Sequence, residues 1–132
     1  MNLKRISHEL KDTVWILQDS EIIVNPTTKF ILPSNYPFVC PQLMIHGNTH
    51  IHLLKMELHQ YAHFCKSCHI EVYCICCRSI TSRWSPCYTC KDVYHEYILF
   101  KKYIFNIRML HKLYQKNIPD VIIKEISSYL LL

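Results

Sequence analysis

The sequence predicts an α+β domain in which helices flank an antiparallel meander of four strands. Three observations lead to this prediction. An amphipathic pattern opens the chain, four short β-rich runs follow with brief turns between them, and helical periodicity returns in the second half. The chain has 132 residues, of which 50% are hydrophobic, which is enough for one core. We therefore expect a single domain over residues 1–132.

The first half of this domain is expected to hold one helix and the meander. Leu3, Ile6 and Leu10 recur at helical spacing, which predicts a helix over residues 2–12. The runs TVWILQ, EIIVN, KFIL and QLMIH then predict four strands. Short turns join the first three, so neighbouring strands must run antiparallel. The segment PSNYPFVCP carries three prolines and predicts an extended loop before the fourth strand, which ends at Gly47.

The second half is expected to be helical around a cysteine-rich insertion. Residues 50–90 form this insertion and begin with a predicted helix over residues 51–63. Residues 91–132 are expected to form C-terminal helices: a long one, interrupted near Lys101 and Lys102, and a final one that starts at Pro119. The buried stripe of this final helix is predicted to comprise Ile122, Ile126 and Tyr129.

Composition and charge argue against nucleic-acid and membrane partners and suggest a location. The net charge is +5 without a long Lys/Arg run, so a nucleic-acid partner is not expected. No apolar run reaches 18 residues, so no membrane partner is expected either. The charged N-terminus does not resemble a signal peptide, which predicts an intracellular, reducing location. A bias towards Ile, Lys and Tyr suggests an AT-rich genome such as that of a large DNA virus, hence host cytoplasm or the virion.

Eight cysteines in a reducing compartment point to metal binding or catalysis rather than to disulfides. Cys65 and Cys68 form one C-x2-C pair, and Cys87 and Cys90 form a second, with 18 residues between the pairs. This spacing is typical of a four-thiolate zinc site. The alternative is that these cysteines fill the core as small hydrophobic residues. Other ligands that could replace members of the set are Cys74, Cys76, Cys77, His69 and His95.

Three segments together resemble ubiquitin-conjugating (E2) enzymes. MNLKRISHELKD resembles their first helix, KFILPSNYPFVCPQLMI resembles their strand–loop–strand with its YPF motif, and RWSPCYT resembles the WSP motif before their next helix. The matches occur in the family's order and cover about half of the chain, and the CxCC arrangement is similar to divergent forms from large DNA viruses. The resemblance implies a UBC-like fold with a zinc-binding insertion.

The resemblance also implies a chemistry and a set of partners. Counting eight residues back from Trp84 identifies Cys76 as the family's nucleophile, with Cys74 as the alternative. This thiol would accept ubiquitin or a ubiquitin-like modifier from an activating enzyme as a thioester and transfer it to an amine with a ligase. The family's ligase-binding surface maps onto Lys4, Arg5, Phe38 and Pro86.

Departures from the family pattern keep other functions open. The family's oxyanion asparagine corresponds to Asn48, which comes too early, because about 25 residues intervene before Cys76. In an extended strand Cys74 and Cys76 would face one side and Cys77 the other. One alternative is a catalytically inactive UBC-like module that is stabilised by zinc and binds proteins. Another is a zinc ribbon that binds nucleic acid, which would leave the YPF and WSP motifs unexplained.

Overall fold

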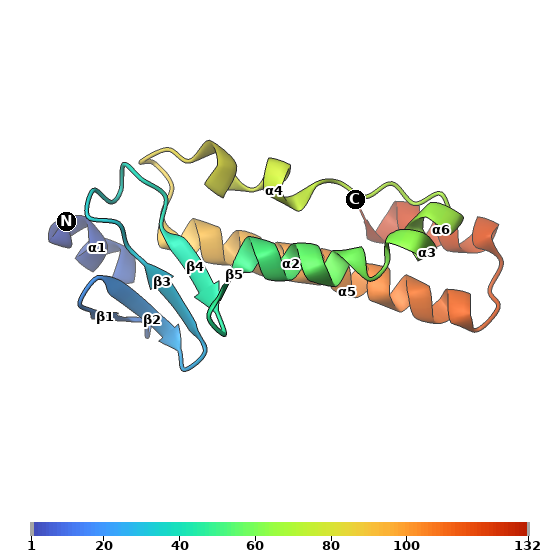
Figure 1. Ribbon diagram of the computed structural model, residues 1–132, viewed down its shortest axis with the longest axis horizontal. Helices are drawn as coiled ribbons and strands as arrows, with labels where there is room; N and C mark the ends of the chain where they lie inside the picture. Colours follow the sequence, from blue (N-terminus) through green and yellow to red (C-terminus); the bar gives the residue numbers. More distant parts are fainter. Residues whose placement is uncertain (1, 132) are drawn as a thin grey trace.

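A computed structural model describes residues 2–131, with the sheet at one end of an elongated molecule and helices at the other (Figure 1). One long helix, α5 (Cys90–Gln115), runs through both halves. Thr89 caps it: its hydroxyl accepts from the backbone of Asp92, and the Asp92 carboxylate accepts from the backbone of Thr89. The helix continues through Lys101 and Lys102, so the expected interruption there is wrong.

The sheet is an antiparallel meander, as the sequence predicts, but it has five strands in chain order rather than four. Ile22 pairs with Phe30 and Phe30 with Leu43, and all three side chains are buried. A fifth, two-residue strand follows Gly47, whose φ of +78° suits glycine at this turn. The strands are β1 (Ile16–Gln18), β2 (Glu21–Asn25), β3 (Thr28–Ile31), β4 (Gln42–Ile45) and β5 (Asn48–Thr49).

One hydrophobic cluster, here called the sheet core, joins the sheet to α1 (Leu3–Leu10) and to the start of α5. Ile6 of α1 and Val93 of α5 are both fully buried in it. Full burial of an Ile or Val side chain stabilises the fold by about 1.5–3 kcal/mol. The α1 prediction is therefore confirmed, and apolar burial on two helices fixes the sheet end of the molecule.

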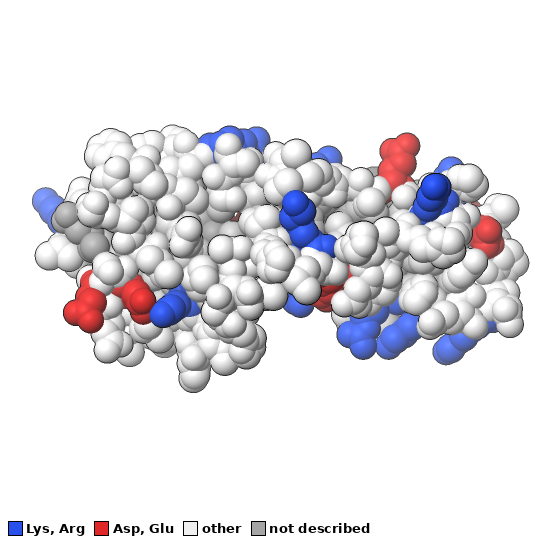
Figure 2. Space-filling model, in the orientation of Figure 1, with Lys and Arg blue, Asp and Glu red and all other residues white. Residues whose placement is uncertain are grey.

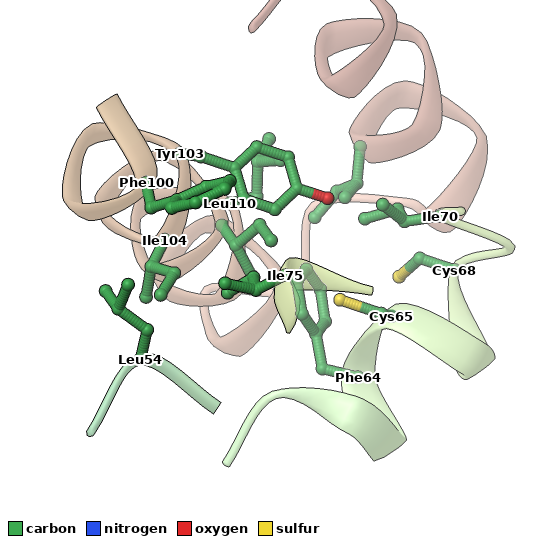
Figure 3. Packing of buried hydrophobic residues seen from close by; sticks show 12 residues of the cluster. Leu54, Phe64, Cys65, Cys68, Ile70, Ile75, Phe100, Tyr103, Ile104 and Leu110 are labelled. Carbon is green, nitrogen blue, oxygen red and sulfur yellow. The ribbon is translucent and has the colours of Figure 1, made fainter. Parts of the chain in front are cut away.

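A second cluster, here called the helical core, lies at the other end (Figure 3). Tyr97 of α5 packs against both clusters and links them. In α6 the buried residues are Ile123 and Ser127, so the predicted stripe through Ile122 and Tyr129 is wrong. The elements around this core are α2 (His50–His59), α3 (Ala62–Ser67), α4 (Ile75–Arg78), a 3-10 helix (Ile80–Arg83) and α6 (Asp120–Leu130).

The positive charge concentrates in the helical half. Residues 97–131 contain six basic and two acidic residues, so +4 of the net charge of +5 lies there. Figure 2 shows basic side chains gathered along the edge where α5 runs. Within residues 2–131, no helix combines the length and apolar character needed to cross a membrane.

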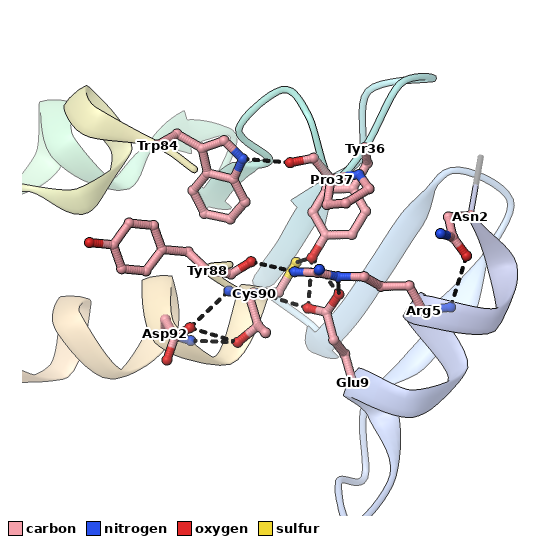
Figure 4. Close-up of polar contacts among 10 residues, drawn as sticks. Asn2, Arg5, Glu9, Tyr36, Pro37, Trp84, Tyr88, Cys90 and Asp92 are labelled. Atoms are coloured by element: carbon pink, nitrogen blue, oxygen red, sulfur yellow. Dashed lines mark hydrogen bonds and ion pairs between the residues drawn. The ribbon is translucent and has the colours of Figure 1, made fainter. Parts of the chain in front are cut away.

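A buried carboxylate connects three distant segments at the sheet end (Figure 4). Glu9 of α1 is 6% exposed and accepts hydrogen bonds from the Tyr36 hydroxyl at 2.6 Å and from the backbone N–H of Cys90 at 2.9 Å. Arg5 Nε donates to the same carboxylate at 3.1 Å. Burial raises the pKa of Tyr36 far above its usual range, so its hydroxyl stays protonated and donates. Three hydrogen-bond donors thus compensate the buried carboxylate for the hydration that it loses.

Replacing Glu9 should therefore destabilise the fold strongly. In Glu9→Gln the amide NH2 group faces donors, and we expect a loss of about 2–4 kcal/mol in the free energy of unfolding. Urea denaturation would measure it. The matched control is Glu21→Gln, because Glu21 pairs with Lys29 at 3.1 Å on the partly exposed sheet surface. That change should cost less than about 1 kcal/mol, and equal losses in the two variants would contradict the role of Glu9.

His50 provides a pH-dependent contribution to stability. It is 4% exposed at the start of α2, and its Nε2 has no hydrogen-bond partner among the described residues. Burial lowers the pKa of His50 from 6.5 to about 4, because the imidazolium would lose its hydration. The contribution of neutral His50 to the free energy of unfolding is therefore fully present above pH 6.5. It is lost progressively as the pH falls from 6.5 to 4.

We expect His50 to contribute a loss of about 3 kcal/mol over this pH range. In His50→Gln the decline in unfolding free energy between pH 6.5 and pH 4 should be smaller by that amount. His52→Gln, at an exposed position two residues later, should retain the wild-type slope. Denaturant titrations at four pH values would decide, and identical slopes in wild type and His50→Gln would refute the assignment.

Candidate thiol site

Three cysteine thiols converge at α4, on the segment that returns from the helical half towards the sheet. The sulfur atoms of Cys74, Cys76 and Cys77 all lie within 4.8 Å of one another, and Cys74 Sγ is 3.0 Å from Cys76 Sγ. An extended strand would have separated Cys77 from the other two. A helical turn forms instead, with Arg78 N donating to the Cys74 carbonyl at 3.1 Å. Ile75 is 1% exposed in the helical core, which anchors the turn to the fold.

The three thiols differ in exposure and in acidity. Cys74 is exposed, and hydrogen bonds from the Cys76 thiol and then from Cys77 lower its pKa to about 7. The pKa of Cys77 rises to about 11 because its thiol donates to Cys74 and lies beside that negative charge. Cys76, the nucleophile that the E2 resemblance indicates, is partly buried. The site therefore presents one exposed thiol, Cys74, that ionises near neutral pH beside a Cys77 thiol that stays protonated.

This arrangement supports two kinds of chemistry. An exposed thiolate is a nucleophile near neutral pH. Three converging sulfurs can also supply three of the four ligands of a zinc ion, or all the ligands of a softer metal. Among the described residues, no His, Asp or Glu joins this group, so a fourth position would fall to water or to a partner's side chain.

The structure does not bring the two predicted C-x2-C pairs together. Cys65 and Cys68 are buried in the helical core (Figure 3), whereas Cys90 is buried in the sheet core. Phe64 contacts Tyr114, which lies 24 residues beyond Cys90 on α5 and thus about 35 Å along the helix axis. The expected four-thiolate zinc site is not formed, because α2 and α3 carry the first pair away from the sheet.

The separated cysteines have the properties of core residues. Burial raises the pKa of Cys65 to about 11 and that of Cys90 to about 12, so both are protonated at neutral pH. Cys68 is 1% exposed. Only Cys87 of the four is exposed, and its thiol donates to Ser85 Oγ at 3.3 Å. Three of the four thus fit the alternative drawn from the sequence, that they pack as small hydrophobic residues.

Asn48, the candidate oxyanion residue, lies away from the thiols. Its Nδ2 donates to the carbonyl of His46 at 3.3 Å within the turn between β4 and β5. Cys74 instead lines a cavity of about 220 Å³ with Leu58 and His59, at the far end of α2. Ten residues of helix correspond to about 15 Å, so Asn48 does not reach the thiols in this structure.

The residues expected to bind a ligase lie at the sheet end, where three segments meet (Figure 4). Trp84 Nε1 donates to the Pro37 carbonyl at 2.7 Å, and an Arg5 guanidinium nitrogen donates to the Tyr88 carbonyl at 2.6 Å. These bonds hold the YPF and WSP loops beside α1. Lys4, Phe38 and Pro86 are exposed, Phe38 to 75%. Arg5 points instead into the fold, towards Glu9.

No protein-family model, curated protein or solved structure matches this chain. Its function must therefore be inferred from the site residues themselves.

The sequence already groups Cys74, Cys76 and Cys77 and offers them as alternative ligands. What it did not predict is the helical turn that brings the three sulfurs together. Ile75, the apolar residue inside C-x-C-C, is buried on the inner side of this turn. The Glu9 network left little local signal, since two of its three partners, Tyr36 and Cys90, are 27 and 81 residues away in the sequence.

Cys74 should alkylate fastest among the eight cysteines. We expect its rate with iodoacetamide to rise through a midpoint near pH 7, because the thiolate is the reactive form. In Cys76→Ala the main hydrogen bond to that thiolate is lost, so the midpoint should move up. Mass spectrometry of peptides after short pulses would give the rate at each site.

Two controls accompany this measurement. Cys87→Ala should leave the profile of Cys74 unchanged, since Cys87 is exposed and lies outside the thiol cluster. Stoichiometric zinc should slow alkylation of Cys74 if the three sulfurs bind the ion, and a chelator should restore it. A Cys74 no more reactive than Cys77 at pH 7 would contradict the assigned acidities.

Proposed function

We propose that the chain is a divergent E2-like protein that carries ubiquitin or a ubiquitin-like modifier as a thioester on Cys74. The observation that carries the proposal is an exposed thiol with a pKa near 7, ten residues before the tryptophan of the WSP motif. Cys76, the residue that family spacing indicates, becomes the neighbour whose sulfur lies 3.0 Å from the nucleophile and whose hydrogen bond lowers the pKa of Cys74.

The arrangement of the matching segments supports this function. α1, the YPF loop and the WSP loop are far apart in the sequence but are bonded to one another at one end of the molecule. The exposed side chains of Lys4, Phe38 and Pro86 give this end a surface on which a ligase could dock. An intracellular, reducing location would keep the thiols free for this chemistry.

The chemical step is an exchange of thioesters without oxidation or reduction. The Cys74 thiolate attacks the carbonyl carbon of the modifier's C-terminal thioester on an activating enzyme. A new carbon–sulfur bond forms, the bond to the activating enzyme's sulfur breaks, and that sulfur leaves as a thiolate. A lysine amine of the substrate then attacks the carbonyl, loses a proton and releases Cys74 as the thiolate.

A second function is favoured by the convergence of three sulfurs. In this alternative the chain is a catalytically inactive UBC-like module, and a zinc ion on Cys74, Cys76 and Cys77 stiffens the segment around α4. The protein would then act through its exposed surface at the sheet end. Metal binding and thioester formation both use the sulfur of Cys74 and therefore compete. One experiment can distinguish the two functions for this reason.

The test is a charging reaction with activating enzyme, ATP and ubiquitin or a panel of ubiquitin-like modifiers, resolved on gels without reductant. We expect an adduct on wild type that disappears with reductant and is absent in Cys74→Ser. Cys87→Ser should charge like wild type, because Cys87 lies outside the thiol cluster. Cys76→Ala should charge more slowly at pH 7, since it raises the pKa of the nucleophile.

The opposite result favours the inactive module. If the folded protein binds one equivalent of zinc and no modifier forms an adduct with or without metal, the thioester proposal fails. If charging persists in Cys74→Ser but disappears in Cys76→Ser, the nucleophile is the residue that family spacing indicates. Circular dichroism of each variant would establish that the comparison is between folded proteins.

A further inference from the structure

A further cavity lies beside the thiol cluster but does not include it. It measures about 650 Å³ and is enclosed by the segment before α4, the middle of α5 and the end of α6. Its size falls in the range typical of small-molecule sites. The thioester chemistry proposed for Cys74 leaves this cavity without a role. Its lining comprises Glu71, Val72, Tyr73, Arg78, Leu99, Lys102, Tyr103, Asn106, Leu130 and Leu131.

Two cations of this lining make no ion pair with the carboxylates of residues 2–131. Arg78 and Lys102 are exposed, and neither forms a salt bridge with any described residue. Glu71 also lines the cavity but makes no ion pair with them. The guanidinium of Arg78 lies 4.1 Å from the centre of the Tyr73 ring, which orients it. The cavity therefore offers two positive groups to an anion, one of them suited to a carboxylate or phosphate.

Part of the wall of the same cavity is apolar and exposed. Val72, Leu99 and Leu130 are 42%, 53% and 43% exposed, although each is a large hydrophobic side chain. They come from three different segments, so their convergence is a feature of the fold and not of one helix face. Covering such side chains with an alkyl chain would be favourable by about 25 cal/mol per Å² of apolar area.

The cavity is built on fixed elements. Asn106 Nδ2 donates to the carbonyl of Leu130 at 3.1 Å, which ties the end of α6 to α5. The rings of Tyr73 and Tyr103 stack with their centres 4.3 Å apart, which ties the segment before α4 to the same helix. A preformed cavity binds a ligand without first having to order its own walls.

We propose that this cavity binds a small amphiphilic anion, with its charged head at Arg78 and Lys102 and its alkyl tail against Val72, Leu99 and Leu130. The anionic head can be a carboxylate or a phosphate, since both match the guanidinium and the ammonium. The site is separate from the thioester chemistry, and it requires neither a modifier nor a metal.

Calorimetric titration of the full chain tests the proposal, with decanoate and decyl phosphate below their micelle concentrations as probes. We expect one saturable site for either or both anions, and at least tenfold weaker binding of decanol and of decyltrimethylammonium. Preference between the two anions identifies the head group. Lys102→Gln should weaken the preferred anion about tenfold while leaving decanol unchanged. Lys112→Gln, an exposed lysine on the same helix outside the cavity, should bind like wild type.

Arg78→Gln should also weaken binding, but its contact with Tyr73 means that folding must be checked by circular dichroism. Lys102→Gln avoids this difficulty, because Lys102 is exposed and makes no ion pair with a described residue. Amide chemical shifts at Leu99 and Asn106 should move on titration. The proposal fails if no probe saturates, if the cationic probe binds as well as the anions, or if Lys102→Gln and Lys112→Gln behave alike.

Discussion

The sheet end of the molecule depends on the buried carboxylate of Glu9. A carboxylate that is 6% exposed is tolerable only with donors around it, and Tyr36, Cys90 and Arg5 supply them. These donors come from the YPF loop, the start of α5 and α1 itself. The network therefore positions every segment of the expected partner surface. It also explains why Arg5 points inward, so that Lys4, Phe38 and Pro86 remain as its exposed members.

A second carboxylate sets where the thiols lie along α5. Glu96 accepts from the Ser79 hydroxyl at 2.6 Å and from the backbone N–H of Ile80 at 3.1 Å. Ser79 directly follows α4, so these bonds fix the thiol-bearing turn beside the second turn of the long helix. Ile75 fixes the same turn from its other side by burial in the helical core. The thiols are thus held on a rigid base although their sulfurs face outward.

The sequence was most informative where structure is local. The β-rich run EIIVN and the turn at Gly47 are set by near neighbours, and both predictions are confirmed. α6 was misread because Val121, Ile122 and Ile123 are all apolar, so periodicity alone does not choose the buried face. The C-x2-C pairs were misread for another reason. Spacing indicates which thiols can turn towards one ion, but the separation of the two cores along α5 decides whether they meet.

The distribution of protons over the thiol cluster bears on which chemistry it serves. A metal site needs all three sulfurs as thiolates, and binding must displace every proton that remains on them. With the pKa of Cys74 near 7 and that of Cys77 near 11, the free protein holds one thiolate beside a firmly protonated neighbour. Such a pair suits a nucleophile, because the neighbour's S–H stabilises the thiolate by a hydrogen bond without transferring its proton. Metal binding would require deprotonation of Cys77, whereas the thioester chemistry proposed above would use the cluster in its existing protonation state.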